Sequence, residues 1–276
     1  MSADVLVTVA KVCSPLDPAS AHIGSGCGYP APGLTYFGFP PIFTIAGWHV
    51  TKPEVLMVIV VLAIVAFFWA AFHKPKLVPR GVQSLGELGI LFVRDQILRP
   101  MIGKKGDNYL SFLVSLFFFI WLMNLLEIIP VAQFPVTAHI GFVWILVALV
   151  WLTYMSVGIR AKGPIGFFTG MIPSGVPWWI MWLLVPLIWL SDIFVRPFTL
   201  GVRLFANMFA GHLLLVVFYF ATWYFVSASF GLVYAAGSLA MVIILTGFEL
   251  LIQALQAFIF TMLTAFYIGD SLESAH

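Results

Sequence analysis

Five long stretches of apolar residues separate short polar segments along the chain. They cover about residues 54–72, 109–129, 139–159, 178–226 and 232–268. The first has no charge after Glu54 and is long enough to cross a hydrocarbon core of about 30 Å. The hydrophobic pattern therefore predicts an all-α membrane protein with about five membrane-crossing helices.

The last two stretches are too long to cross a membrane upright. As a single helix, residues 178–226 would reach roughly 70 Å, more than twice the hydrocarbon thickness. Two upright spans would need a polar turn, and the only candidate, residues 191–196, has no glycine and only two charges of opposite sign. We therefore predict one long tilted helix kinked at a proline, with a hairpin as the alternative. Residues 232–268, at roughly 55 Å, should form a second tilted helix antiparallel to it.

Residues 82–100 differ from the five stretches. Apolar residues recur there roughly at helical spacing, with charged residues between them. The apolar positions are Val82, Leu85, Leu88, Ile90, Leu91, Ile97 and Leu98, and the charged ones are Glu87, Arg94, Asp95 and Arg99. This pattern is typical of an amphipathic helix that lies on the membrane surface, and we expect it on the cytoplasmic side.

Basic residues indicate the orientation of the chain. His73, Lys74, Lys76 and Arg80 directly follow the first span, so that end is expected to be cytoplasmic and the N-terminus outside. An odd number of crossings then leaves the C-terminus in the cytoplasm. We expect two parts: an irregular external segment rich in Gly, Pro and Ser at 1–52, and one membrane domain at 53–276, with a loop or half-inserted segment at 163–177.

Composition supports a membrane protein and excludes several other classes. The chain is 62% hydrophobic and 9% charged, far from the balance of soluble domains. A net charge of +2 gives no reason to expect nucleic acid as a partner. No basic region followed by an apolar run opens the chain, so no cleavable signal peptide is expected. No Cys or His cluster suggests zinc, and His212 lacks a histidine partner for haem on the last helix, so we expect no metal or cofactor.

The two cysteines, Cys13 and Cys27, both fall in the external segment. A disulfide between them is plausible in an oxidising compartment, and two free thiols are the alternative.

A few polar residues lie within the apolar stretches, where each ionised group costs at least ~2.5–3.5 kcal/mol and is a functional candidate. The ionisable ones are Glu127, Asp192, Arg196, Arg203, His212 and Glu249, accompanied by Asn124, Asn207, Gln253 and Gln256. Arg203 has apolar helix on both sides and shares a helix face with Arg196 and Asn207. Snorkelling to an interface or a structural salt bridge is the alternative role for such an arginine, and it suits Arg196 better.

Antiparallel packing of the last two helices would bring certain residues to the same depth. Arg203 then lies level with Gln256, and His212 lies level with Glu249 about two turns nearer the outside. A His–Glu pair is suited to proton relay, because both side chains titrate near neutral pH once their surroundings shift them. His212 lies about 180° around its helix from Arg203, so the two need not line one straight path.

The remaining candidates each have two interpretations. The same antiparallel packing would bring Asp192 level with Tyr267 on the cytoplasmic side, where an acidic residue would open a second aqueous route. Alternatively, Asp192 forms an i,i+4 ion pair with Arg196. Glu127, near Asn124 at the outer end of the second span, either joins the His–Glu pair on the outer side or caps a hydrated helix end.

Three segments resemble subunit a of the F-type ATP synthase membrane sector. They are RPFTLGVRLFANMFAGH at 196–212, ELLIQALQAFIFTMLTAFYI at 249–268 and LMNLLEIIP at 122–130. The resemblance covers most of the chain from about residue 53 onward. Similar chains from high-G+C Gram-positive bacteria also share the GCG-P-APGL pattern found at 26–34.

The resemblance implies a function, partners and a location. Subunit a packs against a rotating ring of c subunits, carries protons through an outer and an inner half-channel, and joins subunit b of the stator stalk and the other ATP synthase subunits in the bacterial plasma membrane. It couples proton flow to ATP synthesis and has no catalytic site of its own. The essential arginine of the family corresponds to Arg203, with Asn207 and Gln256 at positions near it. Relatives with Glu at position 212 have His at position 249, so this chain has the pair exchanged.

Two other functions fit the composition less well. A self-contained secondary transporter or channel, with Arg203 binding an anion, would be expected to show internal repeats, which the chain lacks. A proton-pumping subunit of a respiratory complex would carry lysines within its spans, and there are none here. The sequence leaves H⁺ and Na⁺ both open as the transported ion, although the His–Glu pair favours H⁺.

Overall fold

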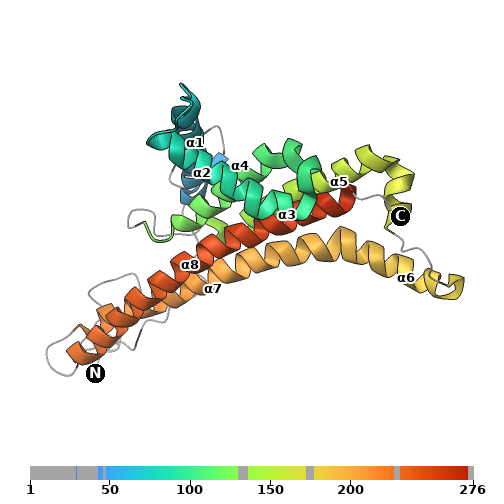
Figure 1. The fold of residues 1–276 in the computed structure, drawn as a ribbon. Helices are drawn as coiled ribbons and strands as arrows, with labels where there is room; N and C mark the ends of the chain where they lie inside the picture. The colour runs from blue at the N-terminus through green and yellow to red at the C-terminus, as the bar shows by residue number, and fades with distance from the viewer. Residues whose placement is uncertain are drawn as a thin grey trace, which may run out of the picture. The chain divides into compact units, whose positions relative to one another are not determined.

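The computed structural model describes Tyr29 and residues 43–45, 48–129, 136–171, 177–226 and 231–272. Cys13, Cys27 and most of the predicted external segment lie outside these residues. The described chain is almost entirely helical (Figure 1). Five of its stretches are long and apolar enough to cross a membrane: Lys52–Phe72, Val82–Leu125, Ile140–Gly170, Trp179–Phe225 and Gly231–Leu272. The predicted all-α membrane fold is confirmed.

Twelve helical elements make up these stretches and the short connections between them in the described chain. In order they are α1 (Lys52–Phe72), α2 (Val82–Phe92), the π-helix η4 (Val93–Leu98), α3 (Arg99–Ile102), the 3₁₀-helix η5 (Gly103–Tyr109), α4 (Leu110–Leu125), the 3₁₀-helix η6 (Val136–Ala138), α5 (Ile140–Gly170), α6 (Trp178–Leu190), the π-helix η7 (Ser191–Val195), α7 (Arg196–Phe225) and α8 (Gly231–Leu272).

The chain divides into two compact units. One comprises residues 1–51 and 210–251, and the other comprises residues 52–209 and 252–276. Helices α7 and α8 each contribute to both units. Within each unit they run side by side and antiparallel, joined by a hydrogen bond between Thr222 and Ser238 in the first unit and between Asn207 and Gln256 in the second.

A short β-hairpin precedes α1. Strand β1 (Phe43–Ile45) pairs antiparallel with β2 (Trp48–Val50), and Thr44 lies opposite His49. This part of the segment expected to be irregular therefore has regular backbone pairing, because two short extended stretches that meet can satisfy each other's backbone groups.

The helix from α6 into α7 continues without a turn. The π-helix η7 lies between them, directly before Pro197, and Figure 1 shows the chain bending there rather than reversing. A proline has no backbone N–H, and a π-helical turn changes the hydrogen-bond register, so the two together explain a bend at this position. The alternative of a hairpin within 178–226 does not hold.

Helix α5 extends beyond the predicted third span. Gly163 breaks it with a φ of 76°, a value that glycine adopts without strain, and a helical turn resumes at Pro164. Residues 164–170, within the predicted loop or half-inserted segment, are therefore helical. The ring of Phe167 packs against Gly158, where it takes the space that a side chain would need.

The predicted amphipathic helix begins at α2, after Gly81, and its α-helical part ends at Ile102. Gly103, which like Gly81 has a positive φ, opens the 3₁₀-helix η5 that leads into α4. Val93, Ile97 and Leu98 are buried on the inner face of the amphipathic helix. The side chain of Gln83 ties the preceding loop to the helix, since it accepts a hydrogen bond from the Lys76 backbone N–H and donates one to the Lys76 carbonyl.

A buried apolar cluster joins α1, the end of α4 and η6. It contains Val60, Met123, Leu126 and Val136. The cluster fixes the end of α4, and this is the end that carries Asn124 and Glu127.

Candidate functional site

Arg203 lies on the exposed side of α7, although it is surrounded in sequence by apolar residues. Leu200, Leu204 and Met208 line the buried side of the same helix. Among the described residues, no hydrogen bond or ion pair to Arg203 is present. The arginine is therefore a permanent positive charge that faces away from its own chain, and the structural salt bridge considered as an alternative has no described partner.

One helical turn from Arg203, an amide pair joins α7 to α8. The Asn207 Nδ2 atom donates a hydrogen bond of 2.8 Å to Gln256 Oε1. Gln256 is only 2% exposed, whereas Asn207 is exposed. Antiparallel packing thus brings Gln256 to the Arg203 region, as the depth argument predicted.

A buried carboxylate–amide contact joins the end of α4 to α8. Gln253 Nε2 donates a hydrogen bond of 2.9 Å to Glu127 Oε2, and both residues are buried. Three residues before Glu127, Asn124 is fully buried and accepts a hydrogen bond from the Thr137 hydroxyl. Glu127 is therefore an integrated part of the packed interior and not a cap at a hydrated helix end.

His212 and Glu249 both lie in the first unit, on α7 and α8, and each is only 4% exposed. The carboxylate of Glu249 occupies the space next to Gly211, where a Cβ atom would collide with it. The absence of a side chain at position 211 therefore lets Glu249 approach the α7 backbone beside His212.

Arg196 lies at the centre of a charged and aromatic cluster. Its Nε is 3.0 Å from Asp192 Oδ1, and its Nη1 is 2.6 Å from Asp270 Oδ2. The guanidinium also lies over the Tyr267 ring, 5.5 Å from its centre. The i,i+4 ion pair of Asp192 with Arg196 is present, and Arg196 contacts Tyr267 as well, so these three predicted residues form one cluster.

Tyr154 on α5 extends this cluster. Its hydroxyl donates a hydrogen bond of 2.9 Å to the Asp192 backbone carbonyl, and its ring is 5.8 Å from that of Tyr267. The carbonyl of Asp192 belongs to η7, and the register change of a π-helix frees backbone acceptors for such bonds. The tyrosine thus fixes the position of the π-helical turn that carries Asp192.

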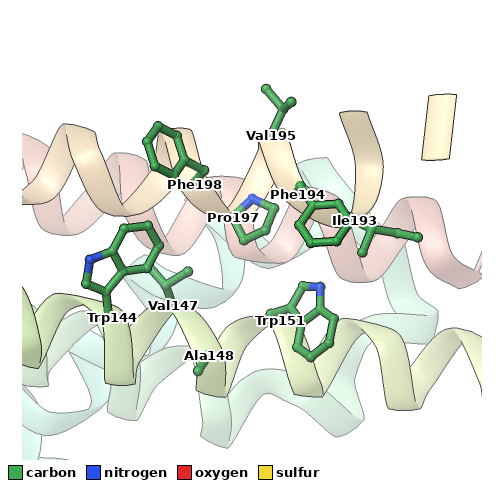
Figure 2. Close-up of a pocket in the computed structure, with 9 residues that line it drawn as sticks. All are labelled: Trp144, Val147, Ala148, Trp151, Ile193, Phe194, Val195, Pro197 and Phe198. Carbon is green, nitrogen blue, oxygen red and sulfur yellow. The ribbon is translucent and has the colours of Figure 1, made fainter. Parts of the chain in front are cut away.

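An apolar groove of about 360 Å³ lies between α5 and the η7–α7 junction (Figure 2). Its walls are Trp144, Val147, Ala148 and Trp151 from α5, and Ile193, Phe194, Val195, Pro197 and Phe198 from the other side. The lining has no ionisable side chain, so the groove is not part of the polar site.

Comparison with known proteins decides the family. The family described as ATP synthase A chain matches residues 55–269. The chain belongs to the ATP synthase A chain family. It is 45% identical over 261 residues to the ATP synthase subunit a of Streptomyces lividans, covering 92% of both chains. It is 41% identical over 251 residues to that of Frankia alni, covering 89% of this chain and 86% of the relative. It is 38% identical over 249 residues to that of Rhodococcus erythropolis, covering 88% and 90%.

The resemblance to high-G+C bacterial chains of subunit a is therefore confirmed, and the chain is a multi-pass helical membrane protein of the ATP synthase complex. Among its described residues, no group of three or more His, Cys, Asp or Glu side chains could hold a metal ion.

Four residues of the site had no role assigned from the sequence, namely Gln253, Asp270, Thr137 and Tyr154. Gln253 was noted only as an uncharged companion, although its spacing of four from Glu249 and three from Gln256 places all three on one helix face. For Asp270, the only feature of the sequence that suggested a contact with Arg196 was its opposite charge. Thr137 had none, because its contact with Asn124 depends on how the chain returns after α4.

Proposed function

We propose that this protein is the proton-conducting stator subunit of ATP synthase, which forms two half-channels against a rotating ring of c subunits and couples proton flow to ATP synthesis. The observation that carries the proposal is the exposure of Arg203 on α7 with no ionic partner among the described residues. A charge within a membrane needs a counter-charge, and because the described residues offer none, we place the partner of Arg203 on another chain. A carboxylate on each c subunit satisfies that need.

The chemistry of arginine suits this role. A guanidinium does not lose its proton in proteins, so Arg203 stays charged whatever passes it. It favours the ionised form of an approaching ring carboxylate and thus promotes proton release. It also blocks direct proton transfer between the half-channels, which would dissipate about 2.3 kcal/mol per 100 mV for each proton without rotation.

The other polar residues are assigned to the half-channels by their places on the helices. His212, Glu249, Glu127 and Asn124 serve the outer half-channel, where the two carboxylates and the imidazole exchange protons with water. Asp192, Arg196 and Tyr267 serve the inner one. Asn207 and Gln256 join α7 to α8 beside Arg203 and hold the arginine side of α7 in place.

The proposed setting follows from the charge pattern and the family. The chain lies in the bacterial plasma membrane with its N-terminus outside and its C-terminus in the cytoplasm. Residues 1–52 form an external segment and residues 53–276 form the membrane domain. Its partners are the c ring, the subunit b stator stalk, the remaining ATP synthase subunits and the lipid bilayer.

An Arg203→Ala variant tests this function. In inverted membrane vesicles that contain the whole synthase, we expect ATP-driven proton pumping to be lost, because nothing would separate the half-channels or attract the ring carboxylate. Arg160→Ala is the matched control, since Arg160 is an exposed arginine on α5 outside the site. Pumping by Arg203→Ala at the level of the control would overturn the proposal.

A further inference from the structure

Three direct hydrogen bonds join six polar residues of the second unit into three pairs, which follow one another along the helices as a line with a gap between successive pairs. Thr137 bonds to Asn124, Gln253 bonds to Glu127, and Asn207 bonds to Gln256. The members between these bonds are helical neighbours: Asn124 and Glu127 are three residues apart, and so are Gln253 and Gln256. The line therefore runs from η6, across the end of α4 and along α8, to α7.

In all three bonds the donor lies farther along the line from Glu127 than the acceptor does, so each bond donates toward Glu127. The Asn207 amide donates to Gln256, and the Gln253 amide donates to the Glu127 carboxylate. On the other side, the Thr137 hydroxyl donates to Asn124. Hydrogen bonds arranged head to tail polarise one another, so donors from both branches add up at the single acidic member of the line.

Two gaps separate the three pairs, one between Asn124 and Glu127 and one between Gln253 and Gln256. Each gap contains buried polar atoms that have no hydrogen-bond partner among the described residues. They are Asn124 Nδ2 at the first gap, and Gln253 Oε1 and Gln256 Nε2 at the second. Asn124 and Gln253 are fully buried, so bulk water does not reach these atoms. An unmade hydrogen bond on a buried polar atom costs about 1–3 kcal/mol, which a bridging water removes.

The donors and acceptors at these gaps are complementary. At the second gap, Gln256 offers a donor and Gln253 an acceptor, and residues three apart on a helix have Cβ atoms about 5–6 Å apart. At the first gap, Asn124 offers a donor beside a carboxylate, and the Glu127 N–H bonds to the Asn124 carbonyl, so the backbone turns tightly between them. One water at each gap would continue the donation toward Glu127.

We propose that Gln253 is a positioning residue of the proton path. It holds the Glu127 carboxylate and, with one water at each gap, completes a hydrogen-bonded line from Thr137 to Asn207. Only Glu127 exchanges a proton, taking it from the water at the first gap and returning it to that water, because a carboxamide neither gains nor loses a proton at neutral pH. Gln253, Gln256 and Asn207 stay neutral and orient the carboxylate. This inference rests on the proposed proton-conducting function and adds the residue that positions the Glu127 carboxylate.

A Gln253→Leu variant tests the line. In inverted vesicles with the complete synthase, we expect ATP-driven pumping per assembled complex to fall about tenfold or more, because the hydrogen bond lost involves a charged group. Thr264→Val is the matched control. Thr264 is also buried on α8, but its hydroxyl bonds only to the Phe260 carbonyl of its own helix. This control should pump at the wild-type rate.

An exchange of the two partners separates positioning from packing. The double variant Glu127→Gln with Gln253→Glu keeps one carboxylate and one amide across the same contact. We expect it to pump clearly better than either single variant, an effect that a merely structural role would not give. Gln253→Leu pumping like Thr264→Val, or a double variant no better than Glu127→Gln alone, would overturn the inference. If Gln253→Leu fails to assemble, the exchange decides.

The Arg203→Ala variant, measured in parallel, separates this inference from the proposed function. If Arg203→Ala loses pumping and Gln253→Leu pumps normally, the role proposed for Gln253 is rejected and the proposed function stands. Normal pumping in Arg203→Ala rejects the function and the line together.

Discussion

The side-chain amide of Asn207 on α7 donates to the side-chain carbonyl of Gln256 on α8 at 2.8 Å. The bond lies one helical turn from Arg203, so it fixes the α8 residues that face the arginine. Two antiparallel helices with few polar contacts between them slide past one another easily, and the hydrogen bond from Asn207 to the buried Gln256 helps to set their register.

The amide pair itself is open to measurement. Asn207→Ala leaves the carbonyl of buried Gln256 without its partner, and we expect a loss of about 1–3 kcal/mol in stability. Gln256→Leu in the same chain removes the stranded group, so the double variant should be more stable than additivity predicts. Thermal unfolding of the purified complex in detergent measures all three. Strict additivity would show that the pair is not coupled.

The Arg196 cluster should depend on its less exposed carboxylate more than on its exposed one. The side chains of Asp192 and Asp270 are 14% and 44% exposed, and each is paired with Arg196. We expect Asp192→Asn to lower the thermal stability of the complex more than Asp270→Asn does, because solvent screens the charge of Asp270 more. Equal effects of the two substitutions would contradict the ranking.

We expect the missing side chain at Gly211 to determine the position of the Glu249 carboxylate. Gly211→Ala places a methyl group where the Glu249 carboxylate lies, and that flexible side chain must move. We therefore expect reduced proton pumping with little change in the amount of assembled complex. Gly237→Ala is the control on α8, since nothing lies within 4 Å of a Cβ at that position. Normal pumping by Gly211→Ala would mean that the position of Glu249 is unimportant.

The close approach of α5 and α7 depends on Gly201. A Cβ at this position would lie 2.8 Å from Val147 Cγ2, so Gly201→Ala overpacks the contact by about 1–3 kcal/mol. A second substitution, Val147→Ala, removes the obstructing methyl groups and should recover part of the stability. Small residues allow such contacts between membrane helices, where the solvent is as apolar as the side chains. Thermal denaturation of the single and double variants checks the recovery.

Much of the fold could be predicted because lipid leaves the backbone few choices. A helix satisfies every N–H and C=O within itself, so long apolar runs such as 54–72 and 232–268 had to be helical. The antiparallel order of the last two helices also brought Gln256 to Asn207 and Arg203 by depth alone. The hairpin alternative within 178–226 remained open, because a π-helical turn before Pro197 depends on backbone bonding that residue types do not specify.

The site was only half predictable for a related reason. The depth of a residue in the membrane follows from its position along the helix. Which face of the helix contacts a neighbouring helix depends on how the helices pack. Gln253 therefore stayed a companion residue until α8 was seen to turn it toward Glu127. Asp270 likewise had no assigned role until it reached Arg196 across the helix pair.

The sequence by itself determined which ionisable residues lie within long apolar helices, and it gave the expected order of depth of the residues on the last two helices. Composition and the spacing of helical residues are sufficient for these, because the hydrocarbon core penalises every polar group it encloses. The tertiary structure alone decided how those residues are joined. It left Arg203 exposed on α7, and it placed the Gln253 amide within hydrogen-bond distance of the Glu127 carboxylate and the Asn207 amide within that distance of Gln256. Hydrogen bonds act over about 3 Å, so only the packing of one helix on another fixes which of them form.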